Sequence, residues 1–269
     1  MPIEPLVPRP SVGRVYDRHR RVRLGDASAG GRLRFDAIAR HLQDIANDDA
    51  RDSNIGGDVN AWVVRRTVVD VAAFPVYGEE LTLSTWCSGT GSRWAERRTS
   101  VLGDQRGHVE AASLWVHVDL ATGKPIVVPE RFLDAYGPST GGRTIRARLV
   151  HESPSTSAAT MPWTLRFADF DVLGHVNNAA YWAVVEQQLA TRRELRAPLR
   201  AEVEYRSPVE ADDELTVLVA DHDDGFSLWW MVGDEVRTTA VVVPSTIDAG
   251  TCDTGATDVA TNEDVVRHE

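Results

Sequence analysis

Cysteine is scarce in this chain, with only Cys87 and Cys252 among 269 residues. Cys87 lies in a strand-like stretch and Cys252 in a polar tail, so we expect no structural disulfide and a reducing compartment. The chain also has no CxxC, no HExxH and no other paired His/Cys spacing of a metal site. Because glycine-rich phosphate loops are missing as well, we expect neither a metal nor a cofactor.

Long apolar runs are missing too. No stretch approaches the roughly 18–20 residues that cross a bilayer. Met1–Pro10 carries prolines and a glutamate in place of the apolar core of a secretory signal, so we expect a cytoplasmic location.

Positive charge is in deficit, with 29 Lys and Arg against 40 Asp and Glu and a net charge of −11. Such a surface makes nucleic acid a poor partner. The last 25 residues, 245–269, hold six acids, one base and few large apolar side chains. We expect them to form a disordered acidic tail.

The first half of the chain has a clear order of hydrophobic patterns. Residues Arg14–Leu24 predict a strand, and apolar residues from Leu33 to Ala46 recur at three- and four-residue steps, which predicts a helix. Four further strand-like runs follow, separated by turns rich in glycine or proline. These runs are Ala61–Phe74, Glu80–Ser88, Ser92–Leu102 and His108–Leu120.

The same order returns after Gly141. Pro162–Ala168 predicts a strand, and the apolar residues from Tyr181 to Leu189 predict a helix. Four strands are again predicted after that helix, with turns between them. They are Leu199–Arg206, Glu214–Ala220, Phe226–Val232 and Glu235–Val243.

One pattern used twice indicates an α+β fold made of two similar modules. In each module a long helix packs on a curved antiparallel sheet of about five strands, and the two sheets can join edge to edge. The expected division is an N-terminal extension at 1–13, a first module at 14–125, a linker at 126–160, a second module at 161–244 and the tail at 245–269.

Polar residues gather at the start of the second predicted helix, between Asp169 and Tyr181. At such a junction the backbone N–H groups and the helix N-terminus can face a substrate carbonyl. An asparagine there can cap the helix, and a glycine permits a close approach of the backbone. The candidate site residues are Asp169, Asp171, Gly174, His175, Val176, Asn177 and Asn178.

A purely structural interpretation stands beside this one. Asp171 could cap the following helix or pair with Arg166, and Asp169 is expected to stabilise the turn. A histidine at a helix entry, such as His175, often only bonds backbone. Cys87 is expected to be a small buried apolar residue and not a nucleophile.

The run Asp-x-Asp-x-x-Gly-His-Val-Asn-Asn-x-x-Tyr from Asp169 to Tyr181 resembles the hotdog thioesterases. A wider resemblance, to the acyl-ACP thioesterases, covers Arg14–Val243. Its matching pieces keep their order and spacing along the chain. They include Leu42-Gln43, Trp62–Arg65, Tyr77–Glu79, Thr85–Gly89, Arg97, Trp115–Asp119, Gly123–Pro125, His175–Asn178 and Glu204–Arg206.

The resemblance implies a double hotdog that hydrolyses a fatty acyl thioester, such as acyl-[acyl-carrier-protein], and releases free fatty acid. It implies that Asp171 acts as nucleophile or general base and that His175 is catalytic. Peptide N–H groups from Gly174 to Val176 would polarise the thioester carbonyl, with Asn177 and Asn178 helping to bind it. The first module would supply the acyl pocket and the second the chemistry.

The chain departs from the plant-type enzymes at two places. Leu173 stands where they have an asparagine, and Pro208-Val209 replaces an acidic and cysteine pair unless Glu204 or Glu210 substitutes. The pattern therefore favours a simpler mechanism centred on Asp171.

Several alternatives stay open at this stage. The substrate could be acyl-CoA and not acyl carrier protein, and the chain could bind acyl groups without cleaving them. A hydratase is disfavoured because the motif lacks Asn-Pro before its histidine. Either a monomer or a homodimer is compatible with a double module.

Overall fold

The computed structural model describes residues 6–55 and 62–245, so all but the first residue of the tail expected at 245–269 lies outside the described residues. The described strands form one ten-stranded antiparallel sheet. The first half contains β1 (Val15–Arg21), α1 (Phe35–Asp52), β2 (Trp62–Ala73), β3 (Glu80–Thr90), β4 (Trp94–Gly103) and β5 (His108–His117). The second contains β6 (Ala159–Met161), α3 (Asn178–Thr191), β7 (Leu199–Tyr205), β8 (Leu215–His222), β9 (Gly225–Val232) and β10 (Glu235–Pro244).

The predicted order of strand, helix and four strands is present in both halves. The strands lie in the order β1-β3-β4-β5-β2-β7-β10-β9-β8-β6, so the second half repeats the first outward from the centre. The halves meet where β2 pairs antiparallel with β7. The strands of the two halves, and their long helices α1 and α3, therefore occupy equivalent places.

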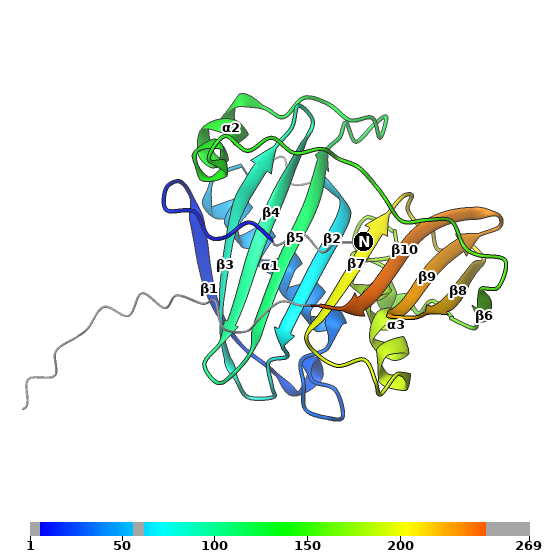
Figure 1. Ribbon diagram of the computed structural model, residues 1–269. Coiled ribbons are helices and arrows are strands. Elements are labelled where there is room, and N and C mark those ends of the chain that lie inside the picture. The colour runs from blue at the N-terminus through cyan, green and yellow to red at the C-terminus, as the bar shows by residue number, and fades with distance from the viewer. Residues whose placement is uncertain (1–5, 56–61, 246–269) are drawn as a thin grey trace, which may run out of the picture.

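The two long helices lie on the same face of the sheet, behind the strands in Figure 1. They pack on each other, and Phe35 of α1 stacks on Trp182 of α3 with ring centroids 5.7 Å apart. One buried apolar cluster contains residues of both halves. In β7 the predicted alternation is present, because Leu199, Ala201, Val203 and Tyr205 are all buried.

One expectation about the middle of the chain needs correction, and another gains detail. The strand predicted at Pro162–Ala168 is wrong: β6 ends at Met161, and Phe167–Asp169 form a 3₁₀ turn. Pro162 has no N–H to donate to a ladder, so the strand ends before it. The segment expected as a plain linker contains the helix α2 (Glu130–Tyr136), which packs near the ends of the first-half strands (Figure 1).

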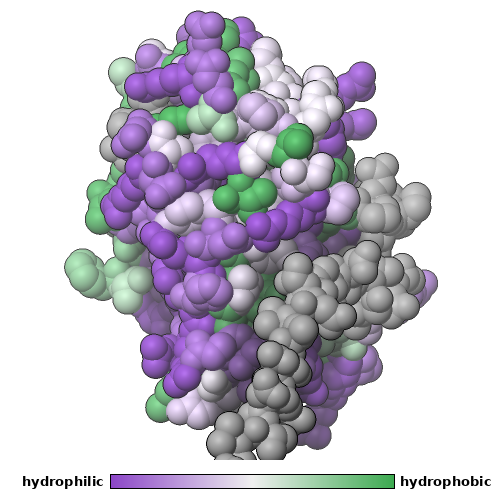
Figure 2. Space-filling view, turned by 90° about the vertical axis from the view of Figure 1, so that its left-hand side faces the viewer, coloured by the Kyte–Doolittle hydropathy of each residue, from purple (hydrophilic) through white to green (hydrophobic). Residues whose placement is uncertain are grey.

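The free edge of the sheet at β1 is charged. Arg18 and Arg20 reach Asp48, and Arg21 pairs with Glu80. Figure 2 views the molecule from this side and shows hydrophilic residues over much of it. Charged edge strands disfavour edge-to-edge association. Among the described helices, none combines the length and hydropathy that crossing a bilayer requires.

Candidate active site

The loop between the 3₁₀ turn and α3 is anchored by Asp169. Its buried carboxylate accepts hydrogen bonds from the Arg166 N–H at 2.8 Å and from Arg166 Nη2 at 2.7 Å. Its carbonyl oxygen accepts from the Asn177 N–H at 2.8 Å. Asp169 is thus the structural residue that the sequence indicated, and Arg166 pairs with it and not with Asp171.

Asp171 lies at the turn of this loop and is partly exposed. Its Oδ1 accepts from the Leu173 N–H at 2.9 Å, and its Oδ2 faces Asn177 Nδ2 at 3.4 Å. The loop is closed by hydrogen bonds from the Asp171 N–H to the His175 carbonyl and from the Gly174 N–H to the Asp171 carbonyl, both at 3.0 Å. The carboxylate is therefore held in place by neutral donors and keeps access to solvent.

Gly174 is required for its conformation. Its φ is +79°, a left-handed value that side chains other than glycine rarely adopt. A Cβ atom added here would meet nothing within 4 Å. The expected close approach of another group to this glycine is thus not present in the structure.

His175 pairs with a carboxylate from another part of the second half. Its Nε2 lies 3.2 Å from Glu210 Oε1, and the two residues also form a backbone bridge. Glu204, the other acid considered as a substitute, is fully buried and accepts from the N–H groups of Val150 and His151. Of the two acids, Glu210 is the one that lies at the site.

The start of α3 faces a small cavity. Asn177 caps the helix, because its Oδ1 accepts from the Ala179 N–H at 2.9 Å. Asn178, the first helical residue, lines a cavity of about 20 Å³ together with Gln43 and Trp182. The N–H groups of Gly174 and Val176, by contrast, already donate to backbone carbonyls. Within the described part of the chain, the Asn178 N–H has no acceptor, so it is the amide best placed to meet a carbonyl.

The first half contains a loop with the same backbone structure, 143 positions earlier. Asp26, Ser28 and Gly31 repeat the hydrogen bonds of Asp169, Asp171 and Gly174, with N–H to carbonyl distances of 3.0, 2.8 and 2.9 Å. Gly31 has φ +80°, against +79° at Gly174. The bridges of the two loops also correspond: Ala27 to Leu33 with Phe170 to Val176, and Arg32 to Val76 with His175 to Glu210.

The side chains of the two loops differ where chemistry is expected. Ser28 stands in place of Asp171, Arg32 in place of His175, and Val76 in place of Glu210. The first half therefore has the same loop without the carboxylate and the imidazole of the second.

The first-half loop is also occupied by a side chain. Glu186 of α3 accepts from Arg32 Nη2 at 2.9 Å and Nη1 at 3.1 Å, and from the Phe35 N–H at 3.2 Å. Phe35 is the first residue of α1, so a carboxylate binds at the N-terminus of that helix. The counterpart of Glu186 in α1, 143 positions earlier, is Gln43.

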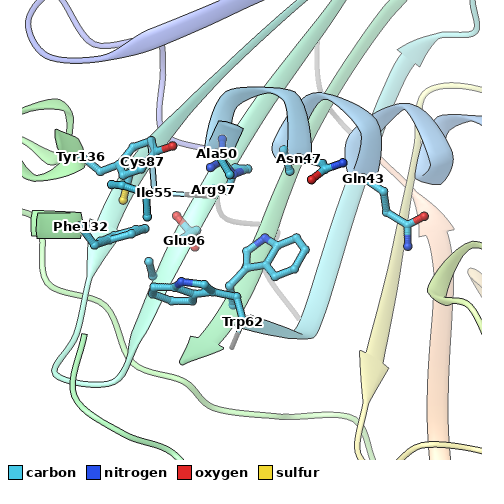
Figure 3. A pocket seen from close by; sticks show the side chains of 13 residues that line it. Gln43, Asn47, Ala50, Ile55, Trp62, Cys87, Glu96, Arg97, Phe132 and Tyr136 are labelled. Carbon is cyan, nitrogen blue, oxygen red and sulfur yellow. The ribbon is translucent and has the colours of Figure 1, made fainter. Parts of the chain in front are cut away.

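A larger cavity of about 230 Å³ lies in the first half, between α1, the sheet and α2 (Figure 3). Trp62 and Phe132 pack against each other at its wall, with ring centroids 4.7 Å apart. Cys87 lines it as a buried thiol whose pKa burial raises to about 11, which agrees with the expected structural role. Other lining residues are Gln43, Ala46, Asn47, Ala50, Ile55, Ala95, Glu96, Arg97, Trp115 and Tyr136.

A buried carboxylate binds several groups at one end of this cavity. Asp49 of α1 accepts from Arg97 Nη1 at 2.6 Å, from Arg14 Nε at 2.7 Å and from the Tyr136 hydroxyl at 2.9 Å. Burial acts to lower the pKa of Arg97, but Asp49 outweighs it and the pKa is raised. Asp49 was not among the residues predicted from the sequence. The sequence could have indicated it, because Asp49 follows Leu42 and Ile45 at three- and four-residue steps and so lies on the apolar face of α1.

One group of potential metal ligands occurs in the part of the chain that the structure covers, namely His151, Glu202 and Glu204. Each is already paired: His151 Nδ1 lies 2.8 Å from the Thr239 hydroxyl, Glu202 lies 3.6 Å from Arg66 Nε, and Glu204 lies 3.3 Å from Arg206 Nη2. Since arginines already balance both carboxylates, the group fits an ion-pair network better than a cation site.

Comparison with known proteins places these features in a family. The family models for the acyl-ACP thioesterase N-terminal and C-terminal domains match residues 13–136 and 152–245. An uncharacterized protein of Mycobacterium tuberculosis is 32% identical over 88% of this chain and 95% of its own length. The chloroplastic palmitoyl-acyl carrier protein thioesterase of Gossypium hirsutum is 25% identical over 63% of this chain and 46% of that protein.

Solved structures share the fold. The 12:0-ACP thioesterase of Umbellularia californica superposes with a TM-score of 0.72 at 21% identity, covering 85% of this chain and 96% of its own. An acyl-ACP thioesterase of Bacteroides thetaiotaomicron gives a TM-score of 0.66 at 20% identity, covering 85% and 97%.

Proposed function

The chain belongs to the acyl-ACP thioesterase family, and from this membership we propose that it hydrolyses a fatty acyl-[acyl-carrier-protein] and releases free fatty acid. In this proposal each half is a hotdog module, a long helix wrapped by a curved antiparallel sheet. Residues 14–125 bind the acyl chain and residues 161–244 carry the chemistry. Phe132 and Tyr136 line the cavity, so the connecting segment 126–160 contributes to the acyl site.

The difference between the two equivalent loops carries the proposal. Both have the same backbone hydrogen bonds, but only the second has Asp171, His175 and Glu210. The first is filled by Glu186, whereas the helix start at Asn178 opens on a cavity. A single reaction site in the second half, served by the acyl cavity of the first, fits this asymmetry.

The reaction adds water to the thioester and yields a carboxylic acid and a thiol. Asp171 either takes a proton from the water that attacks the carbonyl carbon, or attacks that carbon itself; in the second case the thiol leaves and water then hydrolyses the resulting anhydride, which releases the acid and restores Asp171. The Asn178 N–H, at the positive end of α3, stabilises the negative oxygen that forms. His175, with Glu210 beside it, gives the departing sulfur its proton.

Two alternatives are tested together with this function. The same loop could serve acyl-CoA, because the thioester is identical and only the carrier differs. The second alternative is an acyl-binding protein without activity: Leu173 and Pro208, which replace polar residues of plant-type enzymes, are the features in its favour, and the retained Asp171, Gly174 and His175 are those against it. A cytoplasmic location and the choice between monomer and homodimer stay predictions.

Free-thiol release from acyl carrier protein and acyl-CoA thioesters of matched chain length tests these proposals. Faster release from acyl carrier protein supports the proposed function, and faster release from acyl-CoA supports the first alternative. If neither thioester is cleaved while the acyl group still binds, the protein is an acyl-binding member of the family.

A further inference from the structure

Gln43 occupies in α1 the place that Glu186 occupies in α3. Glu186 reaches across to the other half and accepts from the N–H of Phe35, the first residue of α1, at 3.2 Å. By the repeat of the fold, Gln43 reaches toward the N–H of Asn178, the first residue of α3. The two residues line the same small cavity.

The hydrogen bond from the Phe35 N–H to Glu186, at the start of α1, has no counterpart at the start of α3 among the described residues. Over residues 6–55 and 62–245, neither the Gln43 side chain nor the Asn178 N–H has a hydrogen-bond partner. Between them lies a cavity of about 20 Å³. That is room for about one water or one carbonyl oxygen.

Gln43 also lines the larger acyl cavity, as do Arg97 and Trp115, so the two spaces adjoin at these three residues. Figure 3 shows Gln43 at the end of that cavity toward β7, with Phe132 and Tyr136 at the opposite end. An acyl chain lying in the large cavity would therefore bring its carbonyl group to Gln43 and Asn178.

We propose that Gln43 is a catalytic residue supplied by the first half: its Nε2 donates a hydrogen bond to the thioester carbonyl oxygen, with the Asn178 N–H as the second donor. This inference rests on the proposed function. When the carbonyl carbon is attacked, its oxygen becomes negative, and two neutral donors stabilise that charge. A glutamate at position 43 would repel this negative oxygen. The second half therefore requires an amide at the place where the first-half loop is filled by the carboxylate of Glu186.

Substitution at Gln43 separates this role from a structural one. Gln43→Ala is expected to lower kcat by about 10²–10³-fold, the usual loss for one oxyanion donor, with a much smaller change in KM. Gln43→Glu is expected to be at least as slow, because it places a negative charge beside the oxyanion. The matched control is Asp44→Asn, one residue along on the exposed side of α1, which should keep both parameters.

A second measurement does not need turnover. An acyl ketone with a methylene in place of the thioester sulfur keeps the carbonyl and cannot be hydrolysed. Its infrared carbonyl stretch is expected at lower frequency on wild type than on Gln43→Ala, because a hydrogen bond weakens the C=O bond. Circular dichroism of each variant verifies its fold.

Unchanged kcat in folded Gln43→Ala, or equal carbonyl frequencies on both proteins, overturns the role of Gln43. A wild type that cleaves no thioester overturns the proposed function instead, so the two failures are distinguishable.

Discussion

Glu186 of α3 and the main-chain N–H of Phe35 in α1 are hydrogen-bonded across the two halves of the molecule, 3.2 Å apart. Arg32 adds two further bonds to the same carboxylate. This contact fills the loop that has Ser28 and Arg32 in place of Asp171 and His175. It also shows where a negatively charged oxygen binds at a helix start in this fold.

The Arg32–Glu186 pair is expected to stabilise the joined halves. Arg32→Met leaves Glu186 buried with one amide donor, and breaking such a pair costs about 2–4 kcal/mol of the free energy of unfolding. Adding Glu186→Gln should restore much of the loss, because the charge is removed while an acceptor for Phe35 remains. Urea unfolding measures both variants, and a change below about 0.5 kcal/mol in Arg32→Met would contradict the assignment.

Asp49 gives a second stability test. It is fully buried and binds Arg14, Arg97 and Tyr136. Asp49→Asn leaves two arginines without their shared carboxylate, so we expect a loss of about 3–5 kcal/mol. Asp48→Asn, one residue away with solvent-accessible partners, should cost no more than about 1 kcal/mol. Similar losses for the two variants would show that the buried network contributes little.

His41 makes stability depend on pH. Burial lowers its pKa in the folded protein, whereas in the unfolded chain the imidazole takes up a proton near pH 6.5. As the pH falls from 7 to 5, the unfolded state therefore binds more protons and the fold loses stability, by at most about 1.4 kcal/mol per pH unit. Its Nε2 is buried without a partner among the residues described, so His41→Leu should flatten this slope.

Thermal unfolding at several pH values measures that slope. His19→Gln, which changes an exposed histidine of β1, should leave it unchanged. An equal slope in wild type and His41→Leu would mean that other groups cause the acid sensitivity.

We predict that the volume of the proposed acyl cavity limits the length of the acyl chain. Ala50 lines it from α1, and Ala50→Leu would fill part of its roughly 230 Å³. Each methylene of the acyl chain that no longer fits in the cavity loses about 0.8 kcal/mol of binding free energy. Activity should therefore shift to shorter acyl chains. Competition between thioesters of different length measures the shift, with the exposed neighbour Arg51→Ala as control. An unchanged preference would place the chain elsewhere.

The repeat of the fold could be predicted because helices and strands bury apolar residues at different periods. The alternation in Leu199–Tyr205 and the helical spacing from Phe35 predict elements that are present. The prediction of a strand at Pro162–Ala168 was wrong. Trp163 and Leu165 alternate with polar residues as in a strand, but this segment does not pair with another of the described strands. The short α2 was missed because seven residues hold too few turns for a clear period.

The site could be predicted only in part. Asn177 as a helix cap follows from local rules, and Asp171 and His175 follow from a local motif. The contact of Arg32 with Glu186 joins residues 154 positions apart, so no window of sequence reveals it. The pairing of His175 with Glu210 and the cavity that Gln43 shares with Asn178 likewise depend on how the chain folds.

The rate of free-thiol release from an acyl-[acyl-carrier-protein] by Asp171→Asn and by Ser28→Ala, its counterpart in the first loop, tests the central claim most directly. The account predicts that Asp171→Asn lowers kcat by about 10²–10⁴-fold with the fold intact, while Ser28→Ala keeps wild-type activity. Wild-type activity in Asp171→Asn, or its loss in Ser28→Ala, would contradict a single reaction site in the second half.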